Sequence, residues 1–384
     1  MDTTRNLDGK TTFYRLKNVL LHGKESIRLS CSMKHRLLSF LLCLLVMSTT
    51  GCQRKAHRTG TGQSLSASFD TVILTGSTPV KNQGNSELCW AYAMLATMES
   101  EHIAKGDSVN LSVAYLTRML LQDKATEYYL SSGRKSISLR GVASMLLHYI
   151  YKYGIVPYDS YESPTNVNYR VLCKKVEQVC RKAIARQDGL RKMHEAVDAV
   201  LDTELGYLPG KTVHLLGAEY TPVEFAHSVC YPQEYVSFTS FTHHPFGSEV
   251  VLEVPDNSLQ DRFLNVPLDV MMKRIVCAVK GGHPVCWEGD ISEQAFRNTT
   301  DGFVDLPSSA VPVTQLSRQE AFERLQTTDD HAMTITGMGW KKGRLYFIFR
   351  NSWGKNWGKC GYVFLSEDYV RLKTIAVVMS KDTL

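Results

Sequence analysis

Apolar residues in the first half of the chain recur at helical spacing. Ala91, Leu95, Met98 and His102 fall three and four positions apart, which places them on one face of a helix that begins at Cys89. The same spacing predicts further helical stretches: one opening at 111–116, one over 142–153 and a pair within 169–208.

From Tyr235 onward the pattern changes to short apolar runs bounded by Gly, Pro and Asn, which are typical of strands. The predicted strands cover 250–254, 284–288, 331–336, 345–349 and 375–379, with one more amphipathic helix over 266–279. A helical first half followed by a strand-rich second half predicts an α+β fold of two lobes with a cleft between them.

An export signal is predicted near the N-terminus. Residues 33–51 begin with basic residues, continue with an apolar stretch too short to span a bilayer comfortably, and end in small residues directly before Cys52. This order resembles the lipobox of bacterial lipoproteins, so we expect Cys52 to be lipidated and to become the first mature residue. Residues 1–32 are then an upstream start-site extension. A cleaved signal without lipid and a buried core helix are the alternatives.

Residues 52–68 are polar and rich in serine, glycine and basic side chains, so they predict a flexible tether that cannot bury enough apolar area to order itself. The N-terminal pattern therefore predicts an exported bacterial lipoprotein. We expect membrane lipid as its partner through Cys52, anchorage on the periplasmic or cell-surface face, and a folded domain over 69–384.

The composition adds few constraints. The chain has 384 residues, of which 43% are apolar and 21% charged, so it can bury a large core and is not disordered as a whole. The net charge of +6 is modest, and the basic run over 174–192 is the solvated face of a helix pair, so no nucleic-acid partner is expected. The ten cysteines lack the dense, even spacing of a disulfide scaffold.

Cys89 is the strongest candidate for chemistry, because a loop of small polar residues runs into it and a helix starts at it. Unpaired N–H groups and the helix dipole at such a position favour a thiolate, which is the form that attacks carbonyl carbons. The alternative is a buried structural cysteine.

A cysteine nucleophile needs a base, a group that orients the base, and donors for the oxyanion. Gln83 lies six residues before Cys89, so its amide and the Cys89 backbone N–H are candidates for the oxyanion hole. His331 and Asn351 lie far downstream in short motifs, each of them weak alone. The four together, in this order, are a specific signal.

With these motifs the chain resembles the papain-like cysteine peptidases, and most of all their bleomycin hydrolase and aminopeptidase C branch. The likeness runs from about Val72 to the C-terminus and is strongest at its two ends. Ser86 stands where secreted papains usually have a second cysteine, which favours this branch. The matching segments are Val80–Gln83 before Cys89-Trp90, Pro284–Phe296, His331–Thr334, Asn351–Gly354 and Gly361-Tyr362.

The resemblance implies a papain-like two-lobe fold and peptide substrates, with no metal and no organic cofactor. It implies that Cys89 attacks the scissile carbonyl, that His331 holds the proton and passes it to the leaving amine, and that Asn351 orients His331. Gln83 helps to form the oxyanion hole, and Trp353 shields the contact between His331 and Asn351 from water.

The resemblance also divides the domain into a helical lobe over about 69–165, a helical insertion over about 166–234 and a strand-rich lobe over about 235–384. Gly141 keeps one glycine of a loop whose backbone pairs with substrate in these enzymes, although it is also interpretable as an ordinary turn glycine. Relatives in this branch form hexamers, so a homo-oligomer is a further expectation.

Which end of a peptide is cut stays open. In this branch a C-terminal arm runs into the cleft and its carboxylate meets the substrate's free amine, which implies an aminopeptidase. Here only residues 380–384 follow the last predicted strand, and five residues span at most about 17 Å, so an endopeptidase is the alternative. Acyl transfer to an amine, as in transglutaminase-like proteins, and a non-catalytic surface lipoprotein are further alternatives. The intact set of Gln83, Cys89, His331 and Asn351 argues against both.

Overall fold

The computed structural model describes residues 65–384, except 163, 165, 166, 216, 232, 298, 300, 308, 309 and 311. The predicted extension, the export signal and Cys52 lie outside the described residues, so lipidation stays a prediction. Within the described part of the chain, no helix has the length and apolar character needed to cross a membrane.

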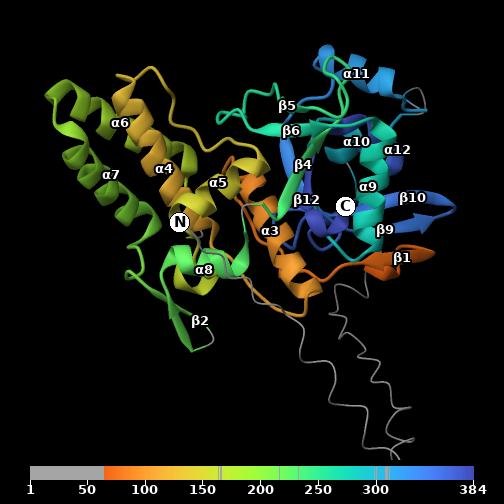
Figure 1. Ribbon diagram of the computed structural model, residues 1–384, viewed down its shortest axis with the longest axis horizontal. Helices are drawn as coiled ribbons and strands as arrows, with labels where there is room; N and C mark the ends of the chain where they lie inside the picture. The colour runs from red at the N-terminus through yellow and green to blue at the C-terminus, as the bar shows by residue number, and fades with distance from the viewer. Residues whose placement is uncertain are drawn as a thin grey trace, which may run out of the picture. The chain divides into compact units, whose positions relative to one another are not determined.

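Helices α4 to α8 gather on one side of α3, and most strands lie on its other side (Figure 1). The helices expected from the apolar spacing are all present, and α8 is an additional helix that the spacing did not predict. The bounds are α3 Cys89–Ala104, α4 Val113–Leu130, α5 Ala143–Tyr153, α6 Tyr169–Arg186, α7 Gly189–Leu205 and α8 Pro222–Val229.

Helix α3 is more buried than an amphipathic helix with one apolar face. Every residue from Trp90 to Glu101 is buried, because α3 packs against other helices on one side and against strands on the other. The predicted apolar face of Ala91, Leu95 and Met98 is buried, and burial extends around the rest of the helix, so α3 is the central helix that the rest of the fold surrounds.

The strands form one mixed sheet in the order β5-β6-β4-β12-β7-β9-β10-β11-β8, and β1 pairs with β9 beside this path. The neighbours β7, β9 and β10 are antiparallel to one another. The bounds are β1 Thr71–Leu74, β4 Tyr235–Thr239, β5 Glu249–Val251, β6 Arg262–Asn265, β7 Val285–Gly289, β8 Phe303–Val304, β9 His331–Lys341, β10 Arg344–Arg350, β11 Tyr362–Ser366 and β12 Thr374–Ser380.

Short elements complete the described part of the chain. They are a hairpin of β2 Val213–Leu215 and β3 Ala218–Tyr220, the helices α9 Leu268–Lys280, α10 Gln294–Arg297, α11 Gln315–Glu323 and α12 Glu367–Lys373, and the 3-10 turns η1 Tyr158–Ser160 and η3 Lys381–Thr383.

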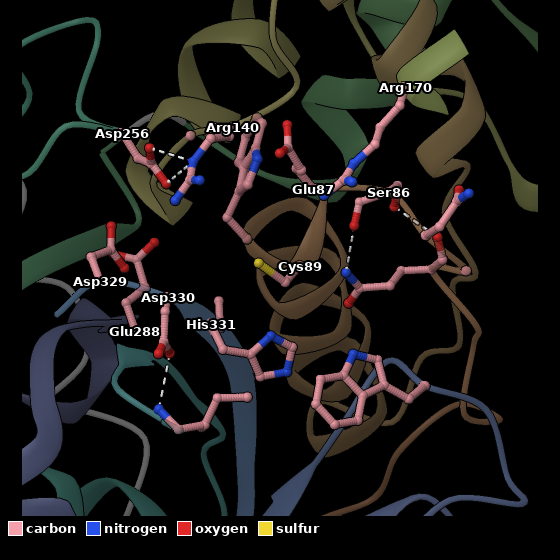
Figure 2. A pocket seen from close by; sticks show the side chains of 18 of the residues that line it. Ser86, Glu87, Cys89, Arg140, Arg170, Asp256, Glu288, Asp329, Asp330 and His331 are labelled. Carbon is pink, nitrogen blue, oxygen red and sulfur yellow. Dashed lines mark hydrogen bonds and ion pairs between the residues drawn. The ribbon is translucent and has the colours of Figure 1, made fainter. Parts of the chain in front are cut away.

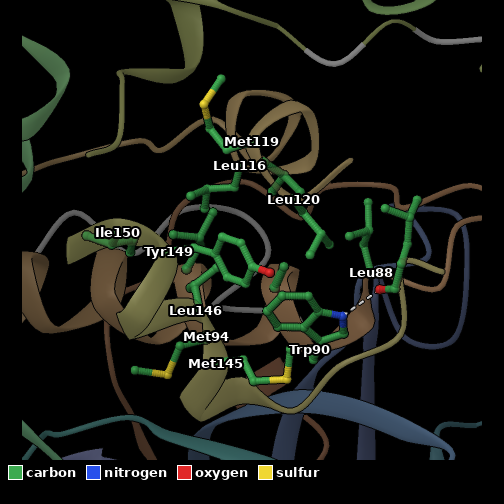
Figure 3. Packing of buried hydrophobic residues seen from close by; sticks show 14 of the residues in the cluster. Leu88, Trp90, Met94, Leu116, Met119, Leu120, Met145, Leu146, Tyr149 and Ile150 are labelled. Atoms are coloured by element: carbon green, nitrogen blue, oxygen red, sulfur yellow. Dashed lines mark hydrogen bonds between the residues drawn. The ribbon is translucent and has the colours of Figure 1, made fainter. Parts of the chain in front are cut away.

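The helical core closes around Trp90, which follows the first residue of α3. Figure 3 shows its ring among the buried side chains of Leu88, Leu120, Met145 and Tyr149, and its indole N–H donates to the carbonyl of Leu139 at 2.9 Å. Because protein interiors are close-packed, this ring holds the first turn of α3 in place.

Direct hydrogen bonds join α3 to the sheet. The hydroxyl of Thr334 on β9 donates to the carbonyl of Ala93 at 2.8 Å. Deeper along α3, the buried carboxylate of Glu99 accepts from Lys81 Nζ and Thr78 Oγ1, both at 2.5 Å. The start of α3, the segment before it and the start of β9 are thus held in one rigid arrangement.

Candidate active site

A cleft of about 750 Å³ lies where α3, α5, β7 and β9 meet (Figure 2). It brings together the site residues predicted from positions far apart in the sequence. Those that line it are Gln83, Cys89, Gly141, His331 and Trp353. Asn351 lies behind His331, and Cys52 is outside the described residues.

Cys89 is the first residue of α3, so its backbone N–H is one of the helix N–H groups that have no acceptor within the helix. Burial raises the pKa of its thiol to about 12, while the backbone N–H groups of Ala332 and Trp90 lower it by less. The N–H groups at the helix start therefore favour the thiolate in the expected direction, but burial opposes them. Desolvation outweighs the helix terminus, and the thiol needs a base beside it.

His331 is that base by position. It is the first residue of β9, directly before Ala332, and its Nε2 lies 2.8 Å from Oδ1 of Asn351. The backbone N–H of Ser352 donates to the same Oδ1 at 2.7 Å, which marks this atom as an acceptor. Nε2 therefore carries the hydrogen, and Nδ1 is left with a lone pair to take a proton.

Burial lowers the pKa of His331 to about 4, although the hydrogen bond to Asn351 raises it. The imidazole is therefore neutral in the empty cleft at neutral pH, as a general base must be. Transfer of the proton from the Cys89 thiol creates two opposite charges side by side, and their attraction offsets part of the cost of charging each one.

Trp353 covers this pair, as expected from the sequence. The centroid of its ring lies 4.8 Å from that of His331, and it is held edge-on by Trp357 at 4.8 Å and by Phe296 at 6.2 Å. His331 is only 4% exposed and Asn351 only 2%, so water has little access to the hydrogen bond that joins them.

Gln83 is fixed at the rim of the cleft by a residue that the sequence left without a role. The hydroxyl of Ser352 donates to Gln83 Oε1 at 2.5 Å, and Gln83 Nε2 donates to the carbonyl of Ser86 at 2.9 Å. Because Oε1 is held by a donor, the NH₂ group is the end that faces the loop before Cys89. One of its two hydrogens remains for a ligand.

Gly141 lines the cleft and packs directly on Trp90. A Cβ at this position would lie 2.8 Å from the Trp90 ring, closer than real Cβ contacts. Close packing therefore explains the glycine. Its neighbour Arg140 forms an ion pair with Asp256, in which Nε donates to both carboxylate oxygens at 2.8 and 3.0 Å.

Acidic side chains gather on one side of the cleft. Asp256, Glu288, Asp329 and Asp330 lie to one side of Cys89 together with Arg140, whereas Arg170 lies on the other side near Glu87 (Figure 2). Burial raises the pKa of Asp329 to about 7 and that of Asp330 to about 6. Sequence reasoning missed this acidic flank, although the Asp329-Asp330 pair directly before His331 was a visible signal.

One group among the described residues has the composition of a metal site. Ligand atoms of His243, His244 and Glu253 lie within 4.8 Å of one another. Both histidines already face the Glu253 carboxylate at 2.8 Å and lie outside the cleft lining. They lie in a turn of the chain, and no step at Cys89 involves them.

Comparisons with known proteins agree with this geometry. A family model described as the Peptidase C1-like family matches residues 211–384, which contain His331 and Asn351. Mitochondrial cysteine proteinase 1 of Saccharomyces cerevisiae is 24% identical over 378 residues, covering 82% of this chain and 77% of that protein. Aminopeptidase G of Lactobacillus delbrueckii subsp. lactis is 26% identical over 371 residues, covering 82% of this chain and 83% of that one.

A solved structure supports the fold. The crystal structure of PepW from Lactobacillus rhamnosis superposes with a TM-score of 0.64 at 20% identity and covers 94% of each chain. The predicted papain-like α+β fold and the resemblance to the bleomycin hydrolase and aminopeptidase C branch are therefore confirmed.

Proposed function

We propose that the chain, which is similar to the papain-like cysteine peptidases of the bleomycin hydrolase and aminopeptidase C branch, hydrolyses peptide bonds with Cys89, His331 and Asn351 and removes N-terminal residues from peptides. The observation that supports this most is the contact between His331 and Asn351, in which Nε2 lies 2.8 Å from Oδ1 and Nδ1 is left to act beside Cys89.

In the first half-reaction, Nδ1 of His331 takes the proton from the Cys89 thiol as the sulfur attacks the scissile carbonyl carbon. The oxygen of the tetrahedral intermediate accepts hydrogen bonds from the Cys89 N–H and from Gln83 Nε2. The intermediate collapses when His331 gives its proton to the leaving nitrogen. The C–N bond breaks, and the thioester of Cys89 remains.

In the second half-reaction, His331 takes a proton from water, and the resulting hydroxide attacks the thioester. The C–S bond then breaks, the Cys89 sulfur leaves with the proton from His331, and a carboxylic acid departs. Asn351 holds the imidazole in the tautomer that both halves require, and Trp353 excludes water from that contact.

Aminopeptidase activity is supported by the relatives, since two of those from Lactobacillus delbrueckii are named aminopeptidase G and aminopeptidase W. One observation favours the endopeptidase alternative. The C-terminal turn η3 lies near the end of α3 that is remote from Cys89, where Asp382 is 3.6 Å from Lys105. The 16 residues of α3 rise about 24 Å, so the turn η3 lies far from the cleft.

A matched pair of substrates separates the two activities. We expect a fluorogenic dipeptide with a free amine to be hydrolysed with a kcat/KM at least 10-fold above that of the same dipeptide with its amine acetylated, since an aminopeptidase recognises the amine. The measurement is initial fluorescence rate against substrate concentration under reducing conditions. Equal or faster hydrolysis of the acetylated form would show a cleft open past the first residue and would exclude the aminopeptidase assignment.

A further inference from the structure

Glu288, at the end of β7, presents a buried carboxylate oxygen without a partner to the cleft. The residue is only 1% exposed and lines the cleft beside Cys89. Its Oε1 accepts a hydrogen bond from the backbone N–H of Ala143 at the start of α5. Its Oε2 is buried and has no hydrogen-bond partner among the described residues. Capping α5 therefore accounts for one oxygen of this carboxylate and leaves the other unexplained.

Asp329 repeats the pattern on the loop before β9. It lines the same cleft, and its Oδ2 is also buried without a hydrogen-bond partner in the described structure. We call Glu288 and Asp329 together the acidic recess. A buried polar group left unpaired costs free energy, and a buried charge costs more. Two such unpaired carboxylate oxygens, Glu288 Oε2 and Asp329 Oδ2, line the cleft that contains the nucleophile.

One cation among the described residues, Arg140, faces the acidic recess and offsets only part of its charge. Arg140 is shared with Asp256, whose two carboxylate oxygens both accept from its Nε. Asp330 accepts from the backbone N–H of Ile291 at 2.9 Å and adds a further negative charge. Burial raises the pKa values of Glu288 and Asp329, and the negative charges of Asp329 on Glu288, and of Asp256 and Asp330 on Asp329, raise them further, whereas Arg140 lowers the pKa of Asp329 by less. An incoming cation would relieve both effects.

The acidic recess lies on the side of Cys89 away from Ser86, which accepts from the Gln83 amide. In Figure 2, Glu288 and Asp329 lie on one side of Cys89, together with Arg140, while Ser86, which holds the Gln83 amide, lies on the other. Gly141, whose counterpart in papain-like enzymes pairs with the substrate chain, lines the cleft next to Arg140. A group held by the acidic recess therefore belongs to the part of the substrate that becomes the acyl-enzyme.

We propose that the acidic recess of Glu288 and Asp329 binds a cationic nitrogen group of the substrate, an ammonium or guanidinium, on the acyl side of the scissile bond. The inference rests on the proposed peptidase function and specifies its substrate class. The cation is either the free α-ammonium of the first residue or the side chain of a lysine or arginine. In the first case these two carboxylates recognise the free amine of the peptide.

Charge-removing variants that keep shape test the proposal. Glu288→Gln retains an oxygen that can accept from Ala143 N–H, and Asp329→Asn is a second, independent variant should the first fail to fold. Glu101→Gln is the matched control, because Glu101 is also a buried carboxylate, 1% exposed, whose pKa burial raises and which pairs with His283 rather than facing the cleft.

Each variant is assayed on two substrate pairs. The first pair is one dipeptide amide with its amine either free or acetylated. The second pair is an acetylated dipeptide amide whose first residue, on the acyl side of the scissile bond, is either lysine or norleucine. The readout is the ratio of kcat/KM for the cationic substrate to that for its neutral partner, in which effects on the Cys89 chemistry cancel. Both cleft variants are expected to lower one ratio by roughly 10- to 100-fold, the range for a lost hydrogen bond to a charged group, whereas Glu101→Gln leaves both unchanged.

The pattern of results identifies the cation or overturns the proposal. A fall confined to the first pair assigns the α-ammonium, and a fall confined to the second assigns a basic side chain. If the wild type cleaves the substrates but neither ratio changes in either cleft variant, the acidic recess does not bind substrate and the peptidase function stands. If the wild type cleaves none of them, the proposed function fails and this inference falls with it.

A pH profile of the same ratio gives an independent readout. The cation binds the ionised carboxylate, and burial raises the pKa of Asp329 to about 7. The wild-type ratio should therefore be low below this value and rise as the pH increases through it. Glu288, Asp256, Asp330 and Arg140 are the charged groups that face Asp329. In Asp329→Asn the rise near pH 7 should disappear, and its persistence would exclude Asp329 as the group that holds the cation.

Discussion

Cys89→Ala and His331→Ala are each expected to lower kcat/KM on a fluorogenic peptide by about 10³-fold or more, because nucleophile and base act as one unit. The structure makes the dependence strong. Burial raises the pKa of Cys89 to about 12, so the sulfur has almost no thiolate of its own at neutral pH. The double variant should be little slower than either single one, which steady-state rates at matched enzyme concentration will show.

Cys277→Ala is the control for this prediction, since Cys277 is an exposed free cysteine outside the cleft lining, and it should retain wild-type activity. Cys89→Ser is the strictest case, because a hydroxyl is far harder to deprotonate than a thiol. Wild-type turnover by Cys89→Ser would contradict the assignment of the nucleophile.

Gln83→Ala is expected to lower kcat by about 10²- to 10³-fold with a small change in KM, the effect of losing one oxyanion-hole donor. The donor acts on the charge that develops in the transition state, so the loss appears in kcat rather than in KM. The measurement is a full kinetic series on the free-amine dipeptide. A change in KM alone would mean that Gln83 only helps to bind the ground state.

Ser352→Ala extends this prediction to a positioning residue. The Ser352 hydroxyl donates to Gln83 Oε1 at 2.5 Å. Its removal lets the amide rotate and should lower kcat by roughly 10- to 100-fold, a tenth of the fold-change expected for Gln83→Ala. Ser352→Thr keeps the hydroxyl and should restore part of the rate. In a Gln83→Ala background, Ser352→Ala should add nothing, since the amide it positions is already absent.

The sequence was most informative where a motif is local. The runs around Cys89, His331 and Asn351 predicted a helix and two strands, and the structure has α3 starting at Cys89, β9 at His331 and β10 ending just before Asn351. Apolar spacing likewise located α5 and the α6–α7 pair, because the apolar residues of an amphipathic helix recur in the sequence at the helical period.

Features that depend on packing were not predictable from the sequence. The raised pKa of Cys89 follows from desolvation in the folded cleft, which outweighs the helix terminus that the sequence shows. The role of Ser352 depends on the segment before α3 lying beside it, as in the bond from Gln83 N–H to the Ser352 carbonyl at 2.7 Å. The acidic recess forms only when β7 and the loop before β9 converge, 41 residues apart at Glu288 and Asp329.

The activation of Cys89 by His331 is tested most directly by the rate of iodoacetate alkylation of Cys89 at pH 6, followed by mass spectrometry of the intact protein and its peptides. At that pH a thiol with a pKa of about 12 has essentially no thiolate, so any fast reaction depends on proton transfer to His331. We expect stoichiometric alkylation at Cys89 in the wild type and a rate at least 100-fold lower in His331→Ala. Equal rates in the two proteins, or a wild-type Cys89 that reacts no faster than the exposed Cys277 and Cys360, would contradict the proposed nucleophile and base.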